Sequence, residues 1–406
     1  MSNVLLVEPD YRAKFPPLGL MKISTYHKNR GDCVTFVRGR DPEMREMHWH
    51  RIYISSLFTW ELPRTVKTIN YYQSSVSSSK DIYVGGIGAT LLPDYIRQNA
   101  PCTVIEGPLD KPSMLGRQKT LISECVPDYD LLTSVSYDYK PTDAYFTRVT
   151  TGCVRKCAFC AVPRLEPTFG YCSPLTKQVS AVNHKYGEKQ HLVILDNNIL
   201  AIDKFRHVVE EIQSLGFTPR AKRNRCLRSV DFNQGIDARY IDDSVAKLLA
   251  QICLDPVRLA FDTDAMEKPY RTAIRCMARE GFVEFTNYML YNFSDNPKSL
   301  YHRMCVNMDL SKELGVRVTG FPMRFVPMDS VNRNHVASRW HWRQLRGIQC
   351  ILKATRGLIS PNPPFFARAF GENFAEFLEI LAMPDHYIMY REHYEAYEAK
   401  AYRRRY

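Results

Sequence analysis

Short apolar runs alternate with stretches of helical periodicity along the first third of the chain. The runs predict strands and the stretches predict helices, because buried strands of parallel sheets read as nearly continuous apolar segments. The strands are expected at residues 4–7, 33–37, 51–58, 82–86 and 103–107, and the helices at about 18–29, 62–75 and 91–99. This order predicts a parallel α/β sheet covered on both faces, with its ligand-binding edge at the carboxyl ends of the strands.

A second alternation follows a stretch rich in Pro, Asp, Ser and Tyr, which predicts a linker. The strands are expected at about 146–151, 191–196, 229–236, 257–262, 283–291 and 316–325, and the helices at about 174–186, 203–215, 242–252, 267–280 and 297–314. Six such units predict a partial or full parallel β/α barrel. The pattern beyond it is mostly helical. We therefore expect an α/β domain at 1–107, a linker at 108–145, a barrel at 146–330 and a helical C-terminal region at 331–406.

The composition is that of a globular protein. Of 406 residues, 45% are hydrophobic and 24% are charged, which excludes a disordered or collagen-like chain. The sequence has no uninterrupted apolar run of about eighteen residues, so neither a transmembrane helix nor a membrane partner is expected. The first residues lack the basic segment and the small-residue cleavage site of a signal peptide, which predicts a cytoplasmic protein.

The chain is strongly basic, with a net charge of +12 and a pI near 9.1. Two segments concentrate this charge, residues 220–228 and residues 339–346, and the second interleaves cations with tryptophans. Guanidinium groups and flat rings suit phosphates and stacked bases, so nucleic acid is one candidate partner. A small anionic or nucleotide-like molecule is another. The alternative is a solvated face with the tryptophans packed into the core.

Three of the twelve cysteines lie within eight residues. Cys153, Cys157 and Cys160 have the spacing Cys-x3-Cys-x2-Cys. Soft thiolate ligands select iron–sulfur clusters, zinc or copper(I). A closed zinc site needs a fourth ligand, and no further Cys or His stands nearby at motif spacing. Three ligands leave one iron of a cubane cluster open for a substrate; a zinc knuckle or unliganded cysteines are the alternatives.

This triad resembles the hallmark of the radical S-adenosylmethionine (SAM) superfamily, which places it on the loop after the first barrel strand. Phe159 matches the aromatic residue before the last cysteine. The resemblance implies a 4Fe–4S cluster on the three cysteines, with the fourth iron binding SAM. It also implies cleavage of SAM to a 5′-deoxyadenosyl radical that takes a hydrogen atom from the substrate. An external flavodoxin-like or ferredoxin-like electron donor would then be needed.

The resemblance also suggests residues that bind SAM. After the second predicted barrel strand, Asp196 and Asn197 look like an acidic version of the motif that faces the SAM amino group. The alternative is that Asn197 or Asn198 caps the next helix.

Polar residues also gather where the third predicted barrel strand ends, at Asn233, Gln234, Asp237 and Arg239. They could bind the SAM carboxylate, its ribose or the substrate, because a guanidinium binds a carboxylate at two points. The alternative is a salt bridge between Asp237 and Arg239 at the barrel rim. Asp262 is the equivalent candidate at the end of the fourth strand.

The first domain resembles the Rossmann-like, cobalamin-binding type of domain that precedes the barrel in one radical SAM subgroup. Residues 16–20 look like its Pro-Pro-Leu-Gly segment, and residues 84–90 resemble its Gly-Gly-x-x-Ala-Thr loop, where Gly85 and Gly86 allow close approach of a ligand. Tight packing without a ligand is the alternative. Residues 8–15 contain no histidine, so cobalamin would be held without a protein histidine ligand.

These features predict a radical SAM enzyme that modifies an unidentified small or nucleotide-like substrate by hydrogen abstraction, methyl transfer or rearrangement. An RNA- or tRNA-modifying radical SAM enzyme is the first alternative. A nucleic-acid-binding protein with a structural metal site is the second. The sequence does not specify the substrate, because radical SAM barrels share their cofactor residues and diverge in their pockets.

Overall fold

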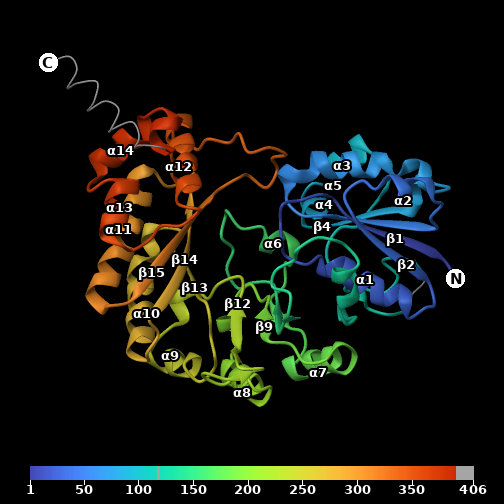
Figure 1. Cartoon of the computed structure of the whole chain (residues 1–406), viewed down its shortest axis with the longest axis horizontal. Coiled ribbons are helices and arrows are strands. Elements are labelled where there is room, and N and C mark those ends of the chain that lie inside the picture. The colour runs from blue at the N-terminus through green and yellow to red at the C-terminus, as the bar shows by residue number, and fades with distance from the viewer. Residues whose placement is uncertain (117–118, 390–406) are drawn as a thin grey trace. The chain divides into compact units, whose positions relative to one another are not determined.

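The computed structural model describes residues 1–116 and 119–389, and these divide into two compact units (Figure 1). Unit 1 comprises Met1–Val193 and Val326–Asn334, whereas unit 2 comprises Ile194–Phe325 and the described residues from His335 onward. The four segments expected from the sequence stay a prediction. The part of the expected helical region beyond residue 389 lies outside the described residues.

Unit 1 opens with the predicted parallel sheet, whose strand order is β2-β1-β3-β4-β5. The strands are β1 Asn3–Glu8, β2 Cys33–Arg38, β3 Arg51–Ser56, β4 Ile82–Gly86 and β5 Thr103–Val104. The helices are α1 Leu18–Lys28, α2 Pro42–Glu46, α3 Leu62–Tyr71, α4 Ile87–Leu91 and α5 Pro93–Asn99. Helices α1 and α3 lie on opposite faces of the sheet (Figure 1). Both faces are therefore covered, as the continuous apolar strands predict.

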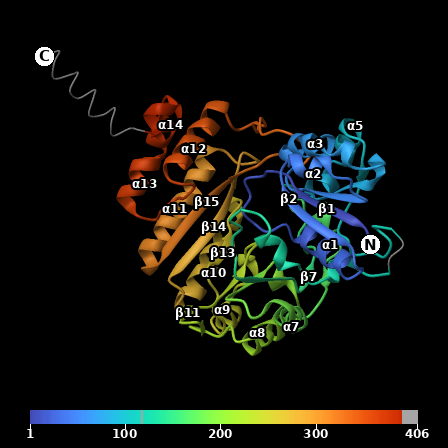
Figure 2. The ribbon, with the colours of Figure 1, turned by 45° about the vertical axis from the view of Figure 1, so that its right-hand side comes forward.

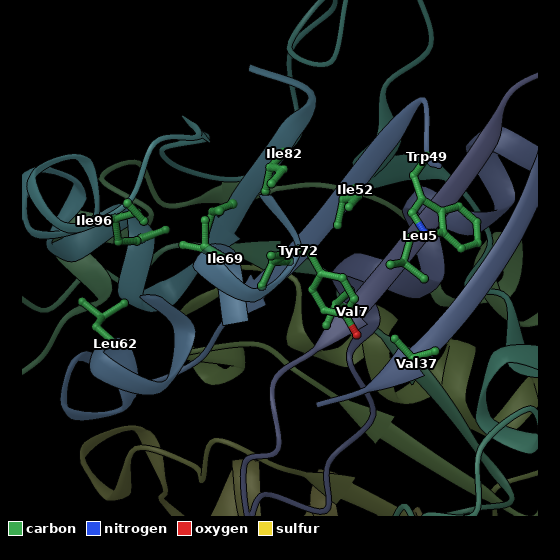
Figure 3. Close-up of a cluster of buried hydrophobic side chains, with 14 residues drawn as sticks. Leu5, Val7, Val37, Trp49, Ile52, Leu62, Ile69, Tyr72, Ile82 and Ile96 are labelled. Carbon is green, nitrogen blue, oxygen red and sulfur yellow. The ribbon is translucent and has the colours of Figure 1, made fainter. Parts of the chain in front are cut away.

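The core on one face of this sheet is formed by apolar side chains of β1, β3 and β4 together with those of helices α3 and α5. Figure 3 shows this cluster, which includes Leu5, Val7, Ile52, Ile54, Leu62, Ile69, Tyr72, Ile82, Val84 and Ile96. The predicted helix at 91–99 corresponds to α5, which begins at Pro93. A further helix, α4, precedes it and was not predicted; it ends before Pro93, which has no backbone N–H to continue it.

A buried carboxylate holds the predicted linker, residues 108–145, against the neighbouring helices of unit 1. Asp128 has an exposed side-chain fraction of 0% and accepts hydrogen bonds from Ser24 Oγ at 2.6 Å and from Tyr186 Oη at 3.0 Å. The ammonium of Lys28 lies 2.7 Å away. These partners belong to α1 and to α7 (Leu175–Tyr186), so one side chain connects the linker to two helices.

The rest of unit 1 starts the second strand–helix series. Strand β6 (Ala144–Thr147) is followed by β7 (Thr150–Thr151), which pairs antiparallel with β8 (Gly170–Tyr171). The single strand expected at 146–151 is therefore interrupted. After α7 comes β9 (His191–Ile194).

Unit 2 continues the series and contains a parallel sheet in the order β13-β14-β15 (Figure 2). Its strands are β12 Ser229–Phe232, β13 Val257–Ala260, β14 Glu284–Tyr291 and β15 Arg317–Arg324. Its helices are α8 Phe205–Ser214, α9 Asp243–Leu249, α10 Glu267–Arg279, α11 Pro297–Leu314, α12 Trp342–Ala354, α13 Pro363–Phe370 and α14 Phe374–Ala382. The fold class predicted from the sequence is confirmed, including the helical C-terminal region as far as it is described. No helix among the described residues combines the length and apolar character needed to cross a bilayer.

The strand ends of the unit 2 sheet converge on one arginine that the sequence analysis did not identify. Arg303 of α11 has an exposed side-chain fraction of 0%. Its guanidinium donates to the carbonyl oxygens of Phe261 and Asp262 at 3.0 Å, to Leu290 O at 2.8 Å and to Asp295 Oδ2 at 2.8 Å. This one side chain satisfies carbonyl groups just beyond β13 and in β14 that would otherwise be buried without a donor.

Arg303→Met should lower the free energy of unfolding by about 3–5 kcal/mol, because Asp295 would stay buried without its cation. Urea unfolding followed by circular dichroism measures the change. The matched control is Arg275→Met, which removes an exposed guanidinium paired with Glu313 and should cost about 0–1 kcal/mol. Equal losses in the two variants would contradict this role of Arg303.

Candidate cofactor site

The three clustered cysteines lie on the loop between β7 and α6 (Val162–Leu165), and all three are half-buried. The N–H of Cys160 donates to the carbonyl oxygen of Cys157 at 3.0 Å, and the N–H of Arg155 lies 3.3 Å from the Cys153 sulfur. The loop is therefore compact, and one backbone N–H already faces one of its sulfurs. Phe159 is half-buried in the same loop.

A glycine and a glutamate set the start of this loop. Gly152 has a φ of +66°, and a Cβ atom on it would lie 2.4 Å from the carbonyl oxygen of Thr168. Its N–H donates to Glu166 Oε2 at 2.8 Å, and Arg148 donates to the other oxygen of the same carboxylate. Because a side chain would clash, only glycine allows the chain to turn here and deliver Cys153.

Three thiols on one short loop are a suitable donor set for an iron–sulfur cluster. Among the described residues, no three His, Cys, Asp or Glu side chains are gathered around a single point where a metal ion would sit. Ligands of a cubane need not share such a point, because each thiolate binds a different iron. The donor chemistry of the loop thus fits the cluster that the sequence predicts, and its role as a metal site stays a prediction.

The cysteine loop is attached to the edge of the Rossmann-like sheet. Helix α6, which follows the loop, packs against α4, and Arg164 Nη2 donates to the carbonyl oxygen of Leu91 at 2.9 Å. Helix α4 begins directly after Gly85 and Gly86. Within unit 1, helices α4 and α6 therefore connect the Gly85–Gly86 turn to the cysteine loop.

Close packing alone accounts for Gly86. Its φ is +104°, and a Cβ atom would lie 2.3 Å from the carbonyl oxygen of Ser56 on the neighbouring strand. Ser56 Oγ donates to Gly85 O at 2.8 Å and accepts from the N–H of Ala89 at 2.7 Å, which satisfies the start of α4. The tight-packing alternative is thus sufficient for Gly86, and a ligand role for either glycine stays a prediction.

The loop after β1 is occupied by structural contacts. Glu8 is buried and accepts hydrogen bonds from Arg38 Nε at 3.1 Å and from the Tyr139 hydroxyl. Burial raises the pKa of Glu8, although Tyr139 and Arg38 oppose the shift. Tyr11 is also buried, with its hydroxyl 2.5 Å from Thr65 Oγ1. These residues stand where a cobalt-binding histidine was sought in the sequence, and they hold the loop onto the sheet.

In unit 2, the acidic segment after β9 is buried. Asp196 has an exposed fraction of 3%, whereas Asn197 is half-buried. Asn198 stands at the start of a 3-10 turn, Ile199–Ala201, but the turn receives no side-chain cap from it. Asn198 Nδ2 instead donates to Asp237 Oδ2 at 3.2 Å. The capping alternative is therefore wrong for Asn198.

The rim salt bridge, which the sequence analysis gave as the alternative to ligand binding, is present. Arg239 Nε and Nη2 donate to the two carboxylate oxygens of Asp237 at 2.7 and 2.8 Å. Burial alone would raise the pKa of Asp237, but the side chain and backbone N–H of Arg239 hold it below its ordinary value. Asn233 is half-buried, and Gln234 is exposed and donates to it at 3.3 Å. The structure thus joins Asn198, Asp237 and Arg239, and it does not test whether any of them also binds a ligand.

Asp262 is a half-buried carboxyl group just beyond β13. Burial raises its pKa to about 6, and the guanidinium groups of Arg303 and Arg239 and a backbone contact with Leu290 only partly oppose the shift. The sequence analysis found Asp262 but missed Arg303, which donates to the backbone carbonyl of Asp262 and lowers the pKa of its carboxyl group. A signal was present, because Arg303 stands among Leu300, Met304 and Leu310 on the apolar face of a predicted helix.

No protein-family model matches the chain, and no curated protein does. Among solved structures, the chain is similar to the cobalamin-dependent S-adenosylmethionine radical enzyme OxsB with aqua-cobalamin and S-adenosylmethionine bound. The TM-score is 0.54 at 13% identity, over 76% of this chain and 52% of OxsB. A second OxsB structure, apo and selenomethionine-labelled, gives 0.49 at 14% identity, over 82% and 54%. The Streptococcus suis protein SuiB, bound to the precursor peptide SuiA, gives 0.35 at 12% identity, over 52% and 46%.

The first of these likenesses establishes the fold. The chain shares the architecture of a cobalamin-dependent radical SAM enzyme, which confirms at the level of the fold the resemblance seen in the sequence. The chain spans about half the length of the OxsB structures it matches.

Asp262→Asn should stabilise the protein above about pH 4 and leave its stability unchanged below that pH. The unfolded carboxyl has an ordinary pKa of 3.8, so the folded chain holds this proton more tightly, and the ionised group opposes folding. Stability is unaffected by Asp262 below about pH 4, falls as pH rises to about 6, and stays lower above that. Urea unfolding at pH 8 should show a gain of about 3 kcal/mol for the variant. A gain that is independent of pH would contradict the raised pKa of this carboxyl.

Proposed function

We propose that the chain is a radical SAM enzyme. The observation that carries this proposal is the Cys-x3-Cys-x2-Cys loop, delivered by Gly152 at the beginning of the second strand–helix series. The fold of the chain, which is that of a solved radical SAM enzyme, supports the proposal. The reaction on the substrate is hydrogen abstraction, methyl transfer or rearrangement, and the substrate is a small or nucleotide-like molecule.

Cys153, Cys157 and Cys160 would hold three irons of a 4Fe–4S cluster, leaving the fourth iron to bind the amino and carboxylate groups of SAM. When bound, such a cluster supplies the electron that cleaves SAM and generates a 5′-deoxyadenosyl radical. The chain's own contribution is to position the thiolates. The N–H of Arg155 beside the Cys153 sulfur would stabilise its negative charge, since hydrogen bonds to cluster sulfurs tune the potential.

Asp196 is the proposed partner of the SAM amino group. A buried carboxylate is a strong acceptor for an ammonium group, because the low surrounding dielectric strengthens the charged hydrogen bond. Asp237 is less suited to this role because Arg239 already occupies both of its oxygens.

Cobalamin is proposed as a second cofactor of unit 1, held without a histidine ligand. The edge of the sheet carries an apolar surface that suits a large flat ligand, since Phe58 and Ile87 are exposed and Phe58 stacks on Trp60 at 4.5 Å. This surface lies beside Gly85 and Gly86. Visible absorption spectra of protein incubated with cobalamin and then desalted test this assignment.

Anaerobic reconstitution with iron and sulfide tests the main proposal. The protein should take up about four irons and four sulfides per chain and release 5′-deoxyadenosine from SAM under a strong reductant. Protein that takes up no iron and no sulfide would overturn the proposal, and colourless protein with one tightly bound zinc would favour a binding protein with a structural metal site.

Cys157→Ser should abolish cluster loading and SAM cleavage, because one of three irons would lose its thiolate. Cys33→Ser is the matched control: this cysteine is exposed at the start of β2, and its loss should leave iron content and 5′-deoxyadenosine release unchanged. Iron analysis and chromatography of the products measure both effects. Retention of SAM cleavage in Cys157→Ser would remove the triad from the mechanism.

Asp196→Asn should weaken SAM binding by about 10- to 100-fold, which is the usual worth of a charged hydrogen bond. Iron content should stay unchanged, because the residue would contact SAM and not the cluster. Anaerobic equilibrium dialysis with labelled SAM measures the affinity, and Asp203→Asn, at an exposed position of the following segment, is the control. Unchanged SAM affinity in Asp196→Asn would assign Asp196 a structural role only.

A further inference from the structure

One of the two basic segments folds as a rigid hairpin. Strands β10 (Lys222–Arg223) and β11 (Cys226–Leu227) pair antiparallel, and Asn224 and Arg225 form the turn. Both turn residues have positive φ, +51° and +66°, which is the pattern of a type I′ turn. No strand was expected here, because the run of charged residues hides the alternation that marks a strand.

Two arginines of this segment adopt a conformation that costs free energy. Arg220 and Arg225 have φ values of +59° and +66°, in the left-handed region where glycine or asparagine is the usual residue. An L-residue with a bulky side chain pays about 1–2 kcal/mol there. Nothing in the backbone requires a cation at either position, so the charge of these two side chains is not explained by the turn.

The base of the hairpin is fixed to the body of unit 2. The N–H of Arg228 donates to Ala221 O at 2.8 Å, and its guanidinium lies 3.8 Å from the ring centre of Phe217. Arg228 is buried, unlike the cations of the hairpin. The paired strands thus fix the backbone positions from which Lys222 and Arg225 project.

Three cations of the hairpin segment stand without an acidic partner among the described residues. Arg220, Lys222 and Arg225 are exposed, and in the part of the chain that the structure describes no carboxylate lies within ion-pair distance of them. Other surface arginines behave differently: Arg97 pairs with Asp94 and Glu106, and Arg275 pairs with Glu313.

Much of the second basic segment is engaged in contacts within unit 2. Trp340 is buried and donates to Asp295 Oδ1 at 3.1 Å. Arg343 and Arg346 donate to the two oxygens of Asp385 at 2.9 and 2.6 Å. The core-packing alternative thus holds for this tryptophan and these two arginines, whereas Arg339 and Trp342 of the same segment are exposed. Within the described part of the chain, the hairpin segment carries three exposed cations without a carboxylate partner, and the second segment carries one.

We propose that the hairpin at residues 220–227 is a docking surface for nucleic acid, which it binds through the phosphate backbone. An array of exposed cations gains affinity for nucleic acid because binding releases condensed counterions. It gains little from an acidic protein, because exposed ion pairs between side chains are worth about 0–1 kcal/mol each. A membrane fits poorly, since Leu227, 59% exposed, is the one large apolar side chain exposed on the hairpin. The proposal does not depend on SAM chemistry.

The test is the triple variant Arg220→Asn, Lys222→Gln, Arg225→Asn. Asparagine tolerates the left-handed conformation, so the turn should persist and the thermal midpoint should not fall. Fluorescence anisotropy with a short labelled single-stranded RNA, measured across salt concentrations, gives the affinity. The variant should bind at least about tenfold more weakly, and the slope of log affinity against log salt should fall by roughly two, about 0.7 per lost phosphate contact.

The matched control is Arg97→Gln, Arg275→Gln, Arg317→Gln, which removes the same net charge from exposed positions that are paired with acids. Its affinity should stay within about threefold of the unmodified chain, because location and not net charge decides the contact. Equal losses in both triple variants would overturn the proposal. So would a hairpin variant that keeps RNA affinity while losing binding to poly-L-glutamate, which would indicate an acidic protein, or to anionic vesicles, which would indicate a membrane.

Discussion

Carbonyl groups at the carboxyl ends of buried parallel strands need donors, and the architecture of both units depends on how they are satisfied. In unit 2, Arg303 supplies them from α11 and is itself neutralised by Asp295. A buried guanidinium is tolerated only with this full set of acceptors, so the strand ends and the helix are fixed together. Asp295 also accepts a hydrogen bond from the Trp340 indole N–H, which connects the segment before α12 to the Arg303–Asp295 pair. The pKa of Asp262 is raised because its carboxyl group is largely removed from water at this edge of the sheet.

Unit 1 solves the same problem with a hydroxyl group and a glycine. Ser56 donates to the strand end at Gly85 and accepts from α4, while Gly86 lets the two strands approach without a Cβ atom. The rigid edge that results carries α4, and α4 carries α6 through Arg164. Packed elements therefore hold the cysteine loop at both ends. Gly152 and Glu166 fix its beginning, and Arg164 fixes the helix that follows it. Reactive thiols need such support, because a loose site cannot hold its ligands in a productive arrangement.

The two units offer different chemistry. Unit 1 holds the thiols and an apolar sheet edge, whereas unit 2 holds buried carboxylates, a positioned arginine and the basic hairpin. In the two proposals above, these sets have separate tasks. The hairpin would then supply sequence-independent affinity through phosphates, and the cofactor residues would supply the reaction. This division matches the general behaviour of nucleic-acid proteins, in which phosphate contacts position and other contacts specify.

The sequence determined the main alternation of strands and helices and the position of the cysteine loop, because apolar periodicity and glycine or proline breaks are local properties. It missed the short elements α2, α4, α6, β8, β10 and β11, which have too few residues to show a period. It also identified Asp237 and Arg239, but it left open whether they bind each other or a ligand. Only the tertiary structure decided that they form a salt bridge, that Trp340 is a core residue and that residues 220–227 are a hairpin with unpaired cations at Arg220, Lys222 and Arg225. The physical reason is that a polar group's partner is chosen among residues far away in the chain, and periodicity carries no information about that choice.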